Sequence, residues 1–516
     1  MSQNRNLDAA RQYHSGTKHS YLSIRMHPHA LDWENKPLLF KIYPTLEVIR
    51  LPRDFQETGC PALSAIAAGP GKETGEAIPD LETLAQLLFF SAGVTRSKKH
   101  EGGETFFRAA ACTGALYEID LYVVCTDLKA KIGPGLVAGI YHFGAAEFGL
   151  RQLRAGDFRQ VIAATAGNDA SIAHAPVTII CTGTYWRNAW KYHSRTYRHF
   201  GWDNGTILAN LLAISAASKL PARIVAGFVD TEVNALLGLD TKREVAFSLV
   251  AIGHQEAEAP TSPELSVLEL PTVPYSREEV DYPAMRKMHE ASSFDSASEV
   301  EAWRGKTPAH EHSTGKGETT SLRLPEESRI PRDTVEQVIS RRGSTRQFAR
   351  DPLTKPQLSL ILDRATRGIP ADFLDPFASH LNELYLIVNN VHGLDSGAYV
   401  YHSEKKFFEL LKAGDFRDKA GYLGLEQQIP ADAAVDVFFL ADLKRILERY
   451  GNRGYRAVHL EAGILGGKLY LAAYAQRLGA SGLTFYDDDV VSFFSPHARG
   501  KSTIFLVALG RSAVRR

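Results

Sequence analysis

The chain has 516 residues, too long for one compact hydrophobic core, so two to four domains are expected. Its formal net charge is zero and 44% of its residues are hydrophobic, a balance that argues against a nucleic-acid-binding surface or attraction to an anionic membrane. No apolar run approaches the roughly 20 residues that span a bilayer, and the four cysteines lack CxxC spacing, so we expect a cytoplasmic protein in a reducing compartment.

The first half of the chain is predicted to begin with a polar entry segment, residues 1–60, and to continue as a globular unit, residues 61–255. Apolar residues recur at helical spacing before Gly93, and short β-branched runs follow further along. The predicted elements of this unit are a helix at 81–92, strands at 121–124 and 177–181, and a central buried helix at 204–218. Helices and buried strands in this order indicate an α+β unit.

Residues 256–330 break this pattern. They are rich in Pro, Glu, Ser and Thr and predict a polar linker, with a helical island near 277–304 that is expected to dock on a neighbouring unit. A second globular unit is predicted at 331–516. Its predicted elements are a helix at 357–367, strands at 384–388 and 435–440, a central helix at 461–478 and a strand at 502–509. Within it, Asp487-Asp488-Asp489 lacks the EF-hand pattern and indicates an exposed helix start or turn.

Two segments of the chain repeat each other. Residues 191–198 are KYHSRTYR and residues 449–456 are RYGNRGYR, so the second string begins 258 positions after the first. At the same offset, AGDFR at 155–159 returns at 413–417. A repeat of this length is a duplicated domain, since solenoid periods are roughly 20–50 residues. The chain is therefore predicted to be a covalent pseudo-dimer of two α+β units, with any site between its halves.

The differences between the copies indicate where chemistry survives. The first copy has a small, glycine-containing loop at 107–118 that the second lacks, and the backbone of such a loop can approach a planar ligand closely. The second copy opens with RRGSTRQF at 341–348, which has no clear counterpart in the first. Guanidinium groups and hydroxyls of this kind suit a phosphate. An ordinary tight loop and a solvated basic turn are the alternatives for these two segments.

Together these strings resemble a known family. The pattern Arg341-Arg342-x-Ser344-x-Arg346-x-Phe348 is similar to the opening of the FMN-dependent nitroreductase superfamily. The loop ACTGALYEIDLYVV at 111–124 resembles the PSAGALYPLELYVV string of its azoline-dehydrogenase branch (SagB/ThcOx type). Lys191-Tyr192 lies where that branch has a Lys-Tyr pair. The chain departs from the branch at Ala111, Cys112 and Glu118, where relatives have Pro, Ser and Pro.

The resemblance implies a nitroreductase-like mixed sheet flanked by helices, with FMN held between the two units. The second unit would contact the phosphate and the first would supply the flavin loop. The implied cofactor-binding residues are Arg341, Arg342, Ser344, Arg346, Gly482, Leu483 and Thr484 of the second unit, and Cys112, Thr113, Gly114, Ala115 and Leu116 of the first. Because each copy lacks what the other keeps, we expect one FMN per chain.

Lys191 and Tyr192 are the predicted catalytic residues. Azoline oxidation removes a carbon-bound proton, and a lysine with a lowered pKa, or a tyrosine beside one, can accept it. The second copy has Arg449 at the position of Lys191, and arginine stays protonated and cannot act as a base. The alternative is structural: the pair could belong to an ion-pair network with Arg195 and Arg198.

The resemblance therefore implies an FMN-dependent dehydrogenase that oxidises azoline rings in a modified peptide, together with other peptide-modifying enzymes. An NAD(P)H-dependent nitro or quinone reductase is the first alternative, and a non-catalytic scaffold of a peptide-modifying complex is the second. A monomer and a homo-oligomer both remain open, because the duplication itself supplies an interface. No metal site is predicted, since His142, His193 and His199 lack metal-ligand spacing.

Overall fold

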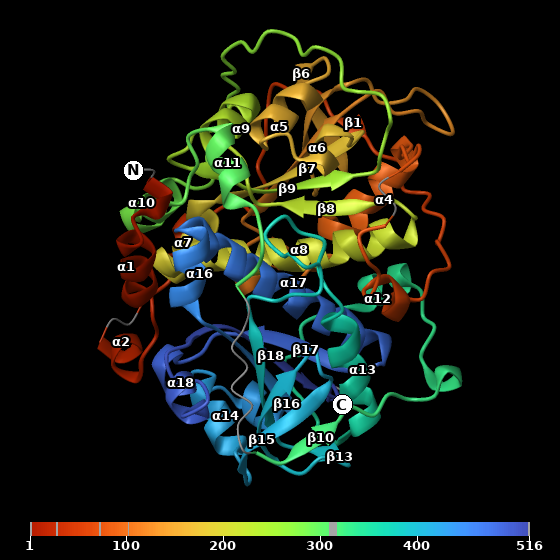
Figure 1. Ribbon diagram of the computed structural model, residues 1–516. Helices are drawn as coiled ribbons and strands as arrows, with labels where there is room; N and C mark the ends of the chain where they lie inside the picture. The colour runs from red at the N-terminus through yellow and green to blue at the C-terminus, as the bar shows by residue number, and fades with distance from the viewer. Residues whose placement is uncertain (1–2, 27–28, 72–73, 102, 309–316, 514–516) are drawn as a thin grey trace.

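The computed structural model describes residues 3–26, 29–71, 74–101, 103–308 and 317–513. Two seven-stranded sheets lie on opposite sides of the central helices α8 (Thr196–Ala217) and α17 (Arg453–Ala475) (Figure 1). The first sheet runs in the order β1 (Ile49–Arg50), β6 (Gly149–Ala155), β5 (Gly139–Gly144), β4 (Ile119–Cys125), β7 (Val177–Thr184), β9 (Glu244–Ile252) and β8 (Ala222–Val225). The second runs β10 (Thr319–Ser321), β15 (Phe407–Ala413), β14 (Gly397–His402), β12 (Glu383–Val388), β16 (Val435–Ala441), β18 (Ser502–Gly510) and β17 (Gly479–Leu483).

The two sheets have the same architecture, strand for strand. Each is centred on strands that the sequence predicts as buried, and every residue of β4, β7 and β16 is buried. The prediction of two tandem α+β units that form an intramolecular pseudo-dimer is confirmed. The expected mixed sheet is not seen, because all the strand pairs described within both seven-stranded sheets are antiparallel. The boundaries of the four predicted segments stay a prediction.

Helices cover both faces of each sheet. Those of the first unit are α3 (Ala62–Ala65), α4 (Leu81–Ala92), α5 (Arg159–Thr165), α6 (Ala170–Ala173), α7 (Tyr185–Tyr192), α8 (Thr196–Ala217) and α9 (Asp230–Leu237). Those of the second are α12 (Val335–Arg341), α13 (Lys355–Ala365), α14 (Arg417–Leu423), α15 (Gln428–Asp432), α16 (Leu443–Tyr450), α17 (Arg453–Ala475) and α18 (Asp487–Phe494). The predicted helix at 81–92 is α4, and the two predicted central helices lie within α8 and α17.

The central helices α8 and α17 pack against each other and join the two halves (Figure 1). Their contact depends on glycine at close approach. A Cβ built on Gly205 would lie 2.5 Å from the carbonyl carbon of Gly463, and one on Gly463 would lie 2.5 Å from the carbonyl oxygen of Trp202. Both distances are shorter than a side chain tolerates, so the interface fixes how the two units sit relative to one another.

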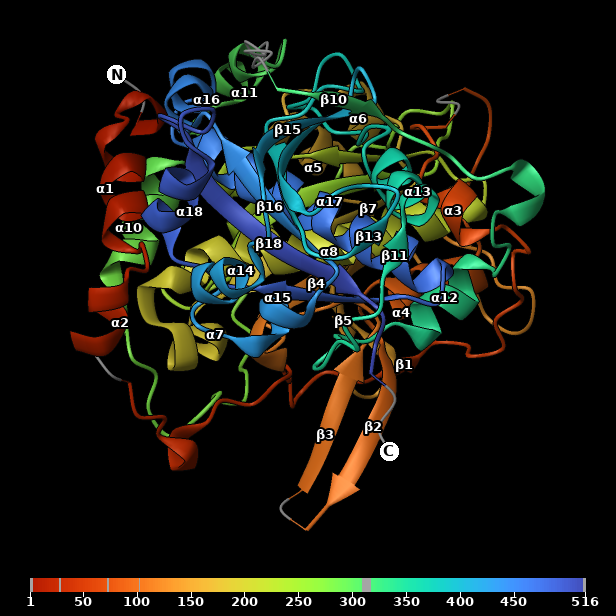
Figure 2. The ribbon, with the colours of Figure 1, turned by 90° about the horizontal axis from the view of Figure 1, so that it is seen from below.

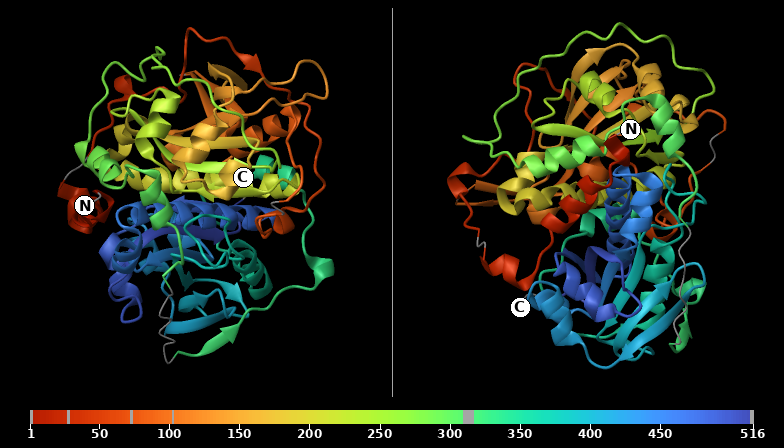
Figure 3. Two further views of the ribbon diagram at one scale, coloured as in Figure 1. Left: turned by 45° about the horizontal axis from the view of Figure 1, so that its top comes forward. Right: turned by 60° about the vertical axis from the view of Figure 1, so that its left-hand side comes forward.

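The entry segment and the linker each contribute a helix to the junction of the two halves. The entry segment forms α1 (Asp8–Gly16) and α2 (Tyr21–Met26), and the linker forms α10 (Pro283–Ala291) and α11 (Ala297–Trp303). Helices α1 and α10 lie side by side at this junction (Figure 3). The helical island predicted near 277–304 therefore docks as expected. None of the described helices is long and apolar enough to cross a membrane.

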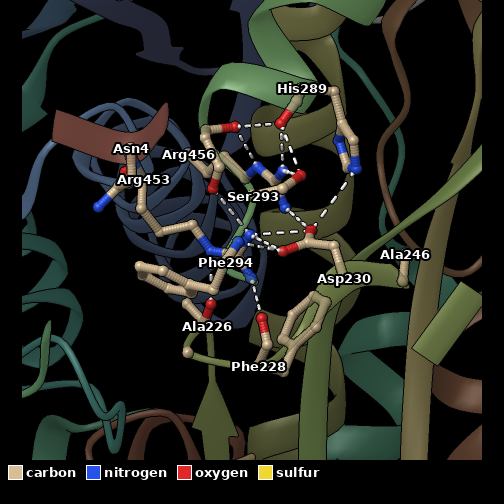
Figure 4. Close-up of polar contacts among 12 residues, drawn as sticks. Asn4, Ala226, Phe228, Asp230, Ala246, His289, Ser293, Phe294, Arg453 and Arg456 are labelled. Atoms are coloured by element: carbon tan, nitrogen blue, oxygen red, sulfur yellow. Dashed lines mark hydrogen bonds and ion pairs between the residues drawn. The ribbon is translucent and has the colours of Figure 1, made fainter. Parts of the chain in front are cut away.

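A buried ion cluster attaches α10 to both units. Asp230, the first residue of α9, accepts hydrogen bonds from Arg453 Nη1 at 2.7 and 2.9 Å and from Arg456 Nη1 at 2.6 Å (Figure 4). The carbonyl oxygens of His289 and Ser292 accept from the same two guanidinium groups, at 2.8 and 3.0 Å. The cluster thus joins the first sheet's helices, the linker and α17 in one desolvated network.

The same cluster occurs in the other half, built on Asp487. Its carboxylate accepts from Arg195 Nη1 at 3.0 Å and from Arg198 Nη1 at 2.7 Å. Carbonyl oxygens of Thr17 and His14, at the end of α1, accept from Arg195 Nη1 at 2.5 Å and from Arg198 Nη2 at 2.6 Å. Helices α1 and α10 are therefore equivalent elements of the two units. The prediction of an exposed helix start is wrong for Asp487, which begins α18 but is buried because two guanidinium groups neutralise it.

One element projects from the body. Strands β2 (Val94–His100) and β3 (Gly103–Arg108) form a hairpin that extends away from both sheets (Figure 2). It leads directly into the loop at 109–118, so much of the extra sequence of the first copy is this hairpin. The second unit has no described hairpin in the corresponding place between α13 and β12.

Candidate functional site

A cleft of about 420 Å³ lies between the two units. The first unit lines it with Ala111, Cys112, Thr113, Gly114, Lys191, Tyr192, His199, Trp202, Asp203 and Thr206. The second unit contributes Ser344, Arg346, Gln427, Tyr470, Gly482, Leu483, Thr484 and Phe505, and the entry segment contributes His19. Its size lies within the range of cofactor pockets, roughly 300–1,000 Å³.

Ten of the fourteen residues predicted for the site line this cleft. They are Lys191, Tyr192, Cys112, Thr113, Gly114, Ser344, Arg346, Gly482, Leu483 and Thr484. They come from opposite halves of the sequence, and the packing of α8 on α17 brings them together. Two of the other four, Ala115 and Leu116, belong to the loop but do not face the cleft, and Leu116 is buried in the core.

The other two, Arg341 and Arg342, point elsewhere, and their assignment to the phosphate is corrected. Arg341 donates to Asp333 at 2.7 Å and to the carbonyl of Tyr474 at 2.9 Å. Arg342 is buried and donates to the carbonyls of Ala109 and Arg108 at 2.8 and 3.0 Å. Arg342 therefore holds the start of the first unit's loop, across the interface. Protein carbonyls already engage both guanidinium groups, which a local sequence pattern does not reveal.

The remaining arginine of the string is available to a ligand. Arg346 is exposed, lines the cleft, and has no hydrogen bond or ion pair with any residue that the structure describes. Thr484 Oγ1, also in the cleft wall, is buried without a hydrogen-bond partner, as is Trp202 Nε1. The rings of Trp202 and Phe505 stack at 5.0 Å beside them. A planar aromatic wall, unsatisfied polar atoms and a free cation suit a flat, hydrogen-bonding ligand that carries an anionic group.

The loop from the first unit is held in shape from below by α8. Asp203 accepts hydrogen bonds from the backbone N–H of Thr113 at 2.8 and 2.9 Å and from its hydroxyl at 2.9 Å. Gly114 has φ of 67°, and a Cβ there would lie 2.9 Å from the hydroxyl oxygen of Tyr192. Glycine is thus required at this position both by conformation and by the tyrosine packed against it.

Three ligand-type side chains meet under the loop: Cys112 and Glu118, where the chain departs from the azoline-dehydrogenase branch, and Asp203 of α8. Cys112 Sγ lies 3.3 Å from Asp203 Oδ2 and 3.4 Å from Glu118 Oε2. This is the one group among the described residues that could hold a metal ion, and it combines residues the sequence does not place together. Burial and the neighbouring Glu118 raise the pKa of Asp203, and burial with the Asp203 charge raises the pKa of the Cys112 thiol. The protons that Asp203 and Cys112 retain can therefore satisfy the polar atoms of this group without a metal ion.

Lys191 and Tyr192 end α7 at the cleft. Lys191 Nζ lies 5.3 Å from the centroid of the Tyr192 ring. Partial burial and the nearby Arg346 charge lower the pKa of Lys191, which favours the neutral amine that a base requires. Burial raises the pKa of Tyr192, so its phenol keeps its proton and is able to donate a hydrogen bond. The predicted ion-pair alternative applies to Arg195 and Arg198, which bind Asp487, rather than to Lys191.

The reciprocal position between the units is closed among the residues that the structure describes. At the repeat offset of 258, Tyr470 of the cleft corresponds to Leu212. Leu212 and Gly69 line a cavity of about 20 Å³, room for about one water molecule. Apolar side chains and Lys468, which donates to the carbonyl of Gly368 at 2.7 Å, fill the space. Between the two units, the described residues therefore form a ligand-sized cleft on one side of the pseudo-dimer and a much smaller cavity on the other.

Several cleft residues were missed in the sequence. They are His19, Ala111, His199, Trp202, Asp203, Thr206, Gln427, Tyr470 and Phe505. Most lie on α8 or α17, where an apolar pattern indicates burial but not which residues face a cavity. The sequence does hold one signal for His199. The second copy has Ala457 at the equivalent position, 258 residues later, so the histidine is not needed by the shared fold.

Comparison with known proteins identifies the family. The nitroreductase family model matches residues 75–254 and 339–510, so the chain belongs to the nitroreductase family and carries two copies of its domain. The protein MJ1384 of Methanocaldococcus jannaschii, named as a nitroreductase, is 28% identical over 183 residues, which cover 34% of this chain and 89% of that protein.

One solved structure shares the fold over nearly the whole chain. The crystal structure of an Anabaena variabilis protein described as a nitroreductase superposes with a TM-score of 0.77 at 25% identity, covering 98% of this chain and 99% of its own. A chain of the Escherichia coli microcin synthetase McbBCD complex with bound peptide covers 49% of this chain and 93% of its own, at 15% identity and a TM-score of only 0.32. Likeness at that level says nothing about activity.

Proposed function

We propose that the protein is an FMN-dependent oxidoreductase that oxidises azoline rings in a modified peptide. Family membership supports the oxidoreductase class. The observation that carries the proposal is the shared cleft: the loop at Cys112–Gly114 and Lys191 from one unit face Ser344 and Arg346 from the other. These are the residues that the resemblance to the azoline-dehydrogenase branch selects from the sequence.

The cleft has the groups to hold FMN. Arg346 would bind the phosphate as a free cation, with the Ser344 hydroxyl beside it. Thr484 Oγ1 and Trp202 Nε1 would receive hydrogen-bonding partners they otherwise lack. The exposed backbone of Gly114 permits close approach of a ring. When bound, FMN would supply the hydride acceptor.

The chain's own residues would manage the proton. Lys191 Nζ takes the proton from the azoline ring carbon, because its neutral form is favoured by partial burial and by Arg346. Tyr192 keeps its phenolic proton and orients the substrate as a hydrogen-bond donor. Trp202 and Phe505 exclude water from the deep wall.

We further propose that the protein works in the cytoplasm alongside other peptide-modifying enzymes. The four cysteines are all unpaired, which is in keeping with a reducing compartment. Both halves of the cleft belong to one chain, so a monomer would suffice for activity.

An anaerobic spectroscopic experiment tests this function. The purified protein is expected to be yellow, and a thiazoline-containing peptide should bleach the flavin absorbance, which air then restores. NADPH without the peptide should bleach it slowly. Rapid bleaching by NADPH with turnover of a nitroarene, and none by the peptide, would support the reductase instead. Protein that never binds flavin would leave the non-catalytic scaffold as the remaining alternative.

A further inference from the structure

One buried histidine in the cleft has a fixed tautomer. Asn188 Nδ2 donates to the carbonyl oxygen of Thr113 at 3.3 Å, which orients the amide. Asn188 Oδ1 then faces the Thr196 hydroxyl at 3.0 Å and His199 Nδ1 at 2.7 Å. An amide oxygen only accepts, so His199 Nδ1 must carry the hydrogen. In the neutral ring the lone pair is therefore on Nε2.

This lone pair is open to the cleft. The His199 ring lines the cavity, and its Nε2 has no hydrogen-bond partner among the described residues. The Nε2 atoms of His14, His289 and His459, by contrast, are sealed in the protein interior. The edge of the Tyr192 ring contacts His199 at a centroid distance of 4.7 Å, which fixes the plane of the imidazole.

The surrounding charges keep this imidazole neutral. Burial and the neighbouring Arg195 lower the pKa of His199, and His19, Arg198 and His459 act in the same direction. The group is thus a permanent acceptor at neutral pH and is poorly suited to carry a proton.

The second copy has lost the whole arrangement. At the offset of 258, Asn188 corresponds to Ile446, Thr196 to Gly454 and His199 to Ala457. The neighbouring Arg195 and Arg198, which serve the interface, are kept as Arg453 and Arg456. The Asn-Thr-His set is therefore present only in the half that has the cleft. A purely structural role would not explain why the loss coincides with the closed reciprocal site.

We propose that His199 Nε2 is a specificity-determining hydrogen-bond acceptor that binds an N–H donor of the molecule in the cleft. The inference rests on the proposed function. Two donors share this chemistry: the N3–H of the flavin ring and an amide N–H of the peptide substrate. A buried hydrogen bond of this kind is worth about tenfold in affinity.

The test compares His199→Phe, which keeps a planar ring but removes the acceptor, with His199→Gln, which restores an acceptor. His459→Phe is the matched control, because it removes a buried imidazole whose Nε2 is sealed. Binding of FMN and of N3-methyl-FMN to apoprotein is measured by fluorescence quenching, and kcat and KM are measured with the thiazoline peptide. Thermal unfolding checks that each variant folds.

If the flavin is the donor, wild type should prefer FMN to N3-methyl-FMN by about tenfold, H199F should lose that preference, and H199Q should regain part of it. If the peptide is the donor, flavin preference should be unchanged while KM rises about tenfold in H199F. A folded H199F that matches H459F in both measurements would overturn the inference but not the proposed function. Wild-type protein that binds no flavin would overturn both.

Discussion

Replacing Asp230 by alanine should lower the free energy of unfolding by about 3–5 kcal/mol, because it leaves charges buried and unpaired. Arg453 and Arg456 both direct Nη1 at this carboxylate, and both are fully buried. Differential scanning calorimetry on the full chain should show a large fall in the unfolding temperature. Asp487→Ala, which removes the equivalent carboxylate, should have a similar effect.

The neighbouring Asp488 provides the control. It is exposed and pairs only with Lys18, at 2.6 Å on the surface, and surface pairs contribute about 1 kcal/mol or less. Asp488→Ala should therefore leave the unfolding temperature nearly unchanged. The conclusion that the clusters fix α1 and α10 to the junction would fail if Asp230→Ala were as mild as Asp488→Ala.

Replacing Lys191 by alanine should slow azoline oxidation about 10²–10⁴-fold, the usual contribution of a positioned base, while bound flavin is retained. Because the neutral amine is the active form, the wild-type rate should rise as pH increases through the lowered pKa of Lys191. The K191A rate should lose this dependence. Stopped-flow flavin bleaching across pH measures both effects.

Two further variants separate the base from other roles. Lys191→Arg keeps the charge but cannot accept a proton, so it should be as slow as Lys191→Ala. Arg449→Ala alters the equivalent residue of the second unit, which donates to the carbonyl of Arg304 at 2.9 Å and does not line the cleft, so its rate should be normal. An active Lys191→Arg would show that the residue positions substrate instead.

The fold was largely predictable from the sequence because the pattern is strong and occurs twice. The helix at 81–92 has its predicted bounds as α4, since Asp80 caps its start and Gly93 follows its end. The strands β4, β12 and β16 contain the predicted apolar runs. The antiparallel pairing of the sheets was not predictable, because an apolar run does not specify its neighbour's direction.

The site was predictable only in part, because the role of its residues depends on partners that only the tertiary structure brings together. Arg341, Arg342 and Arg346 look alike in sequence, and only the structure shows that protein groups occupy the first two. Asp487 looks like part of an exposed acidic turn because its partners, Arg195 and Arg198, lie in the other half of the chain. His199 is an acceptor only through Asn188, eleven positions earlier.

The duplication is best understood as a division of labour around one cleft. Both copies keep an interface cluster of one aspartate and two arginines, whereas the loop, the Lys-Tyr pair and the Asn-Thr-His set occur in the first copy and Arg346 in the second. The closed cavity at Gly69 and Leu212 is what remains of the reciprocal position.

The flavin content of the saturated protein tests this account most directly. Apoprotein is incubated with excess FMN and freed of unbound ligand, and released flavin is then quantified against protein determined by amino-acid analysis. One site built from two halves predicts a ratio close to one FMN per chain. A ratio close to two would show that the reciprocal position also binds, and would contradict the division of labour.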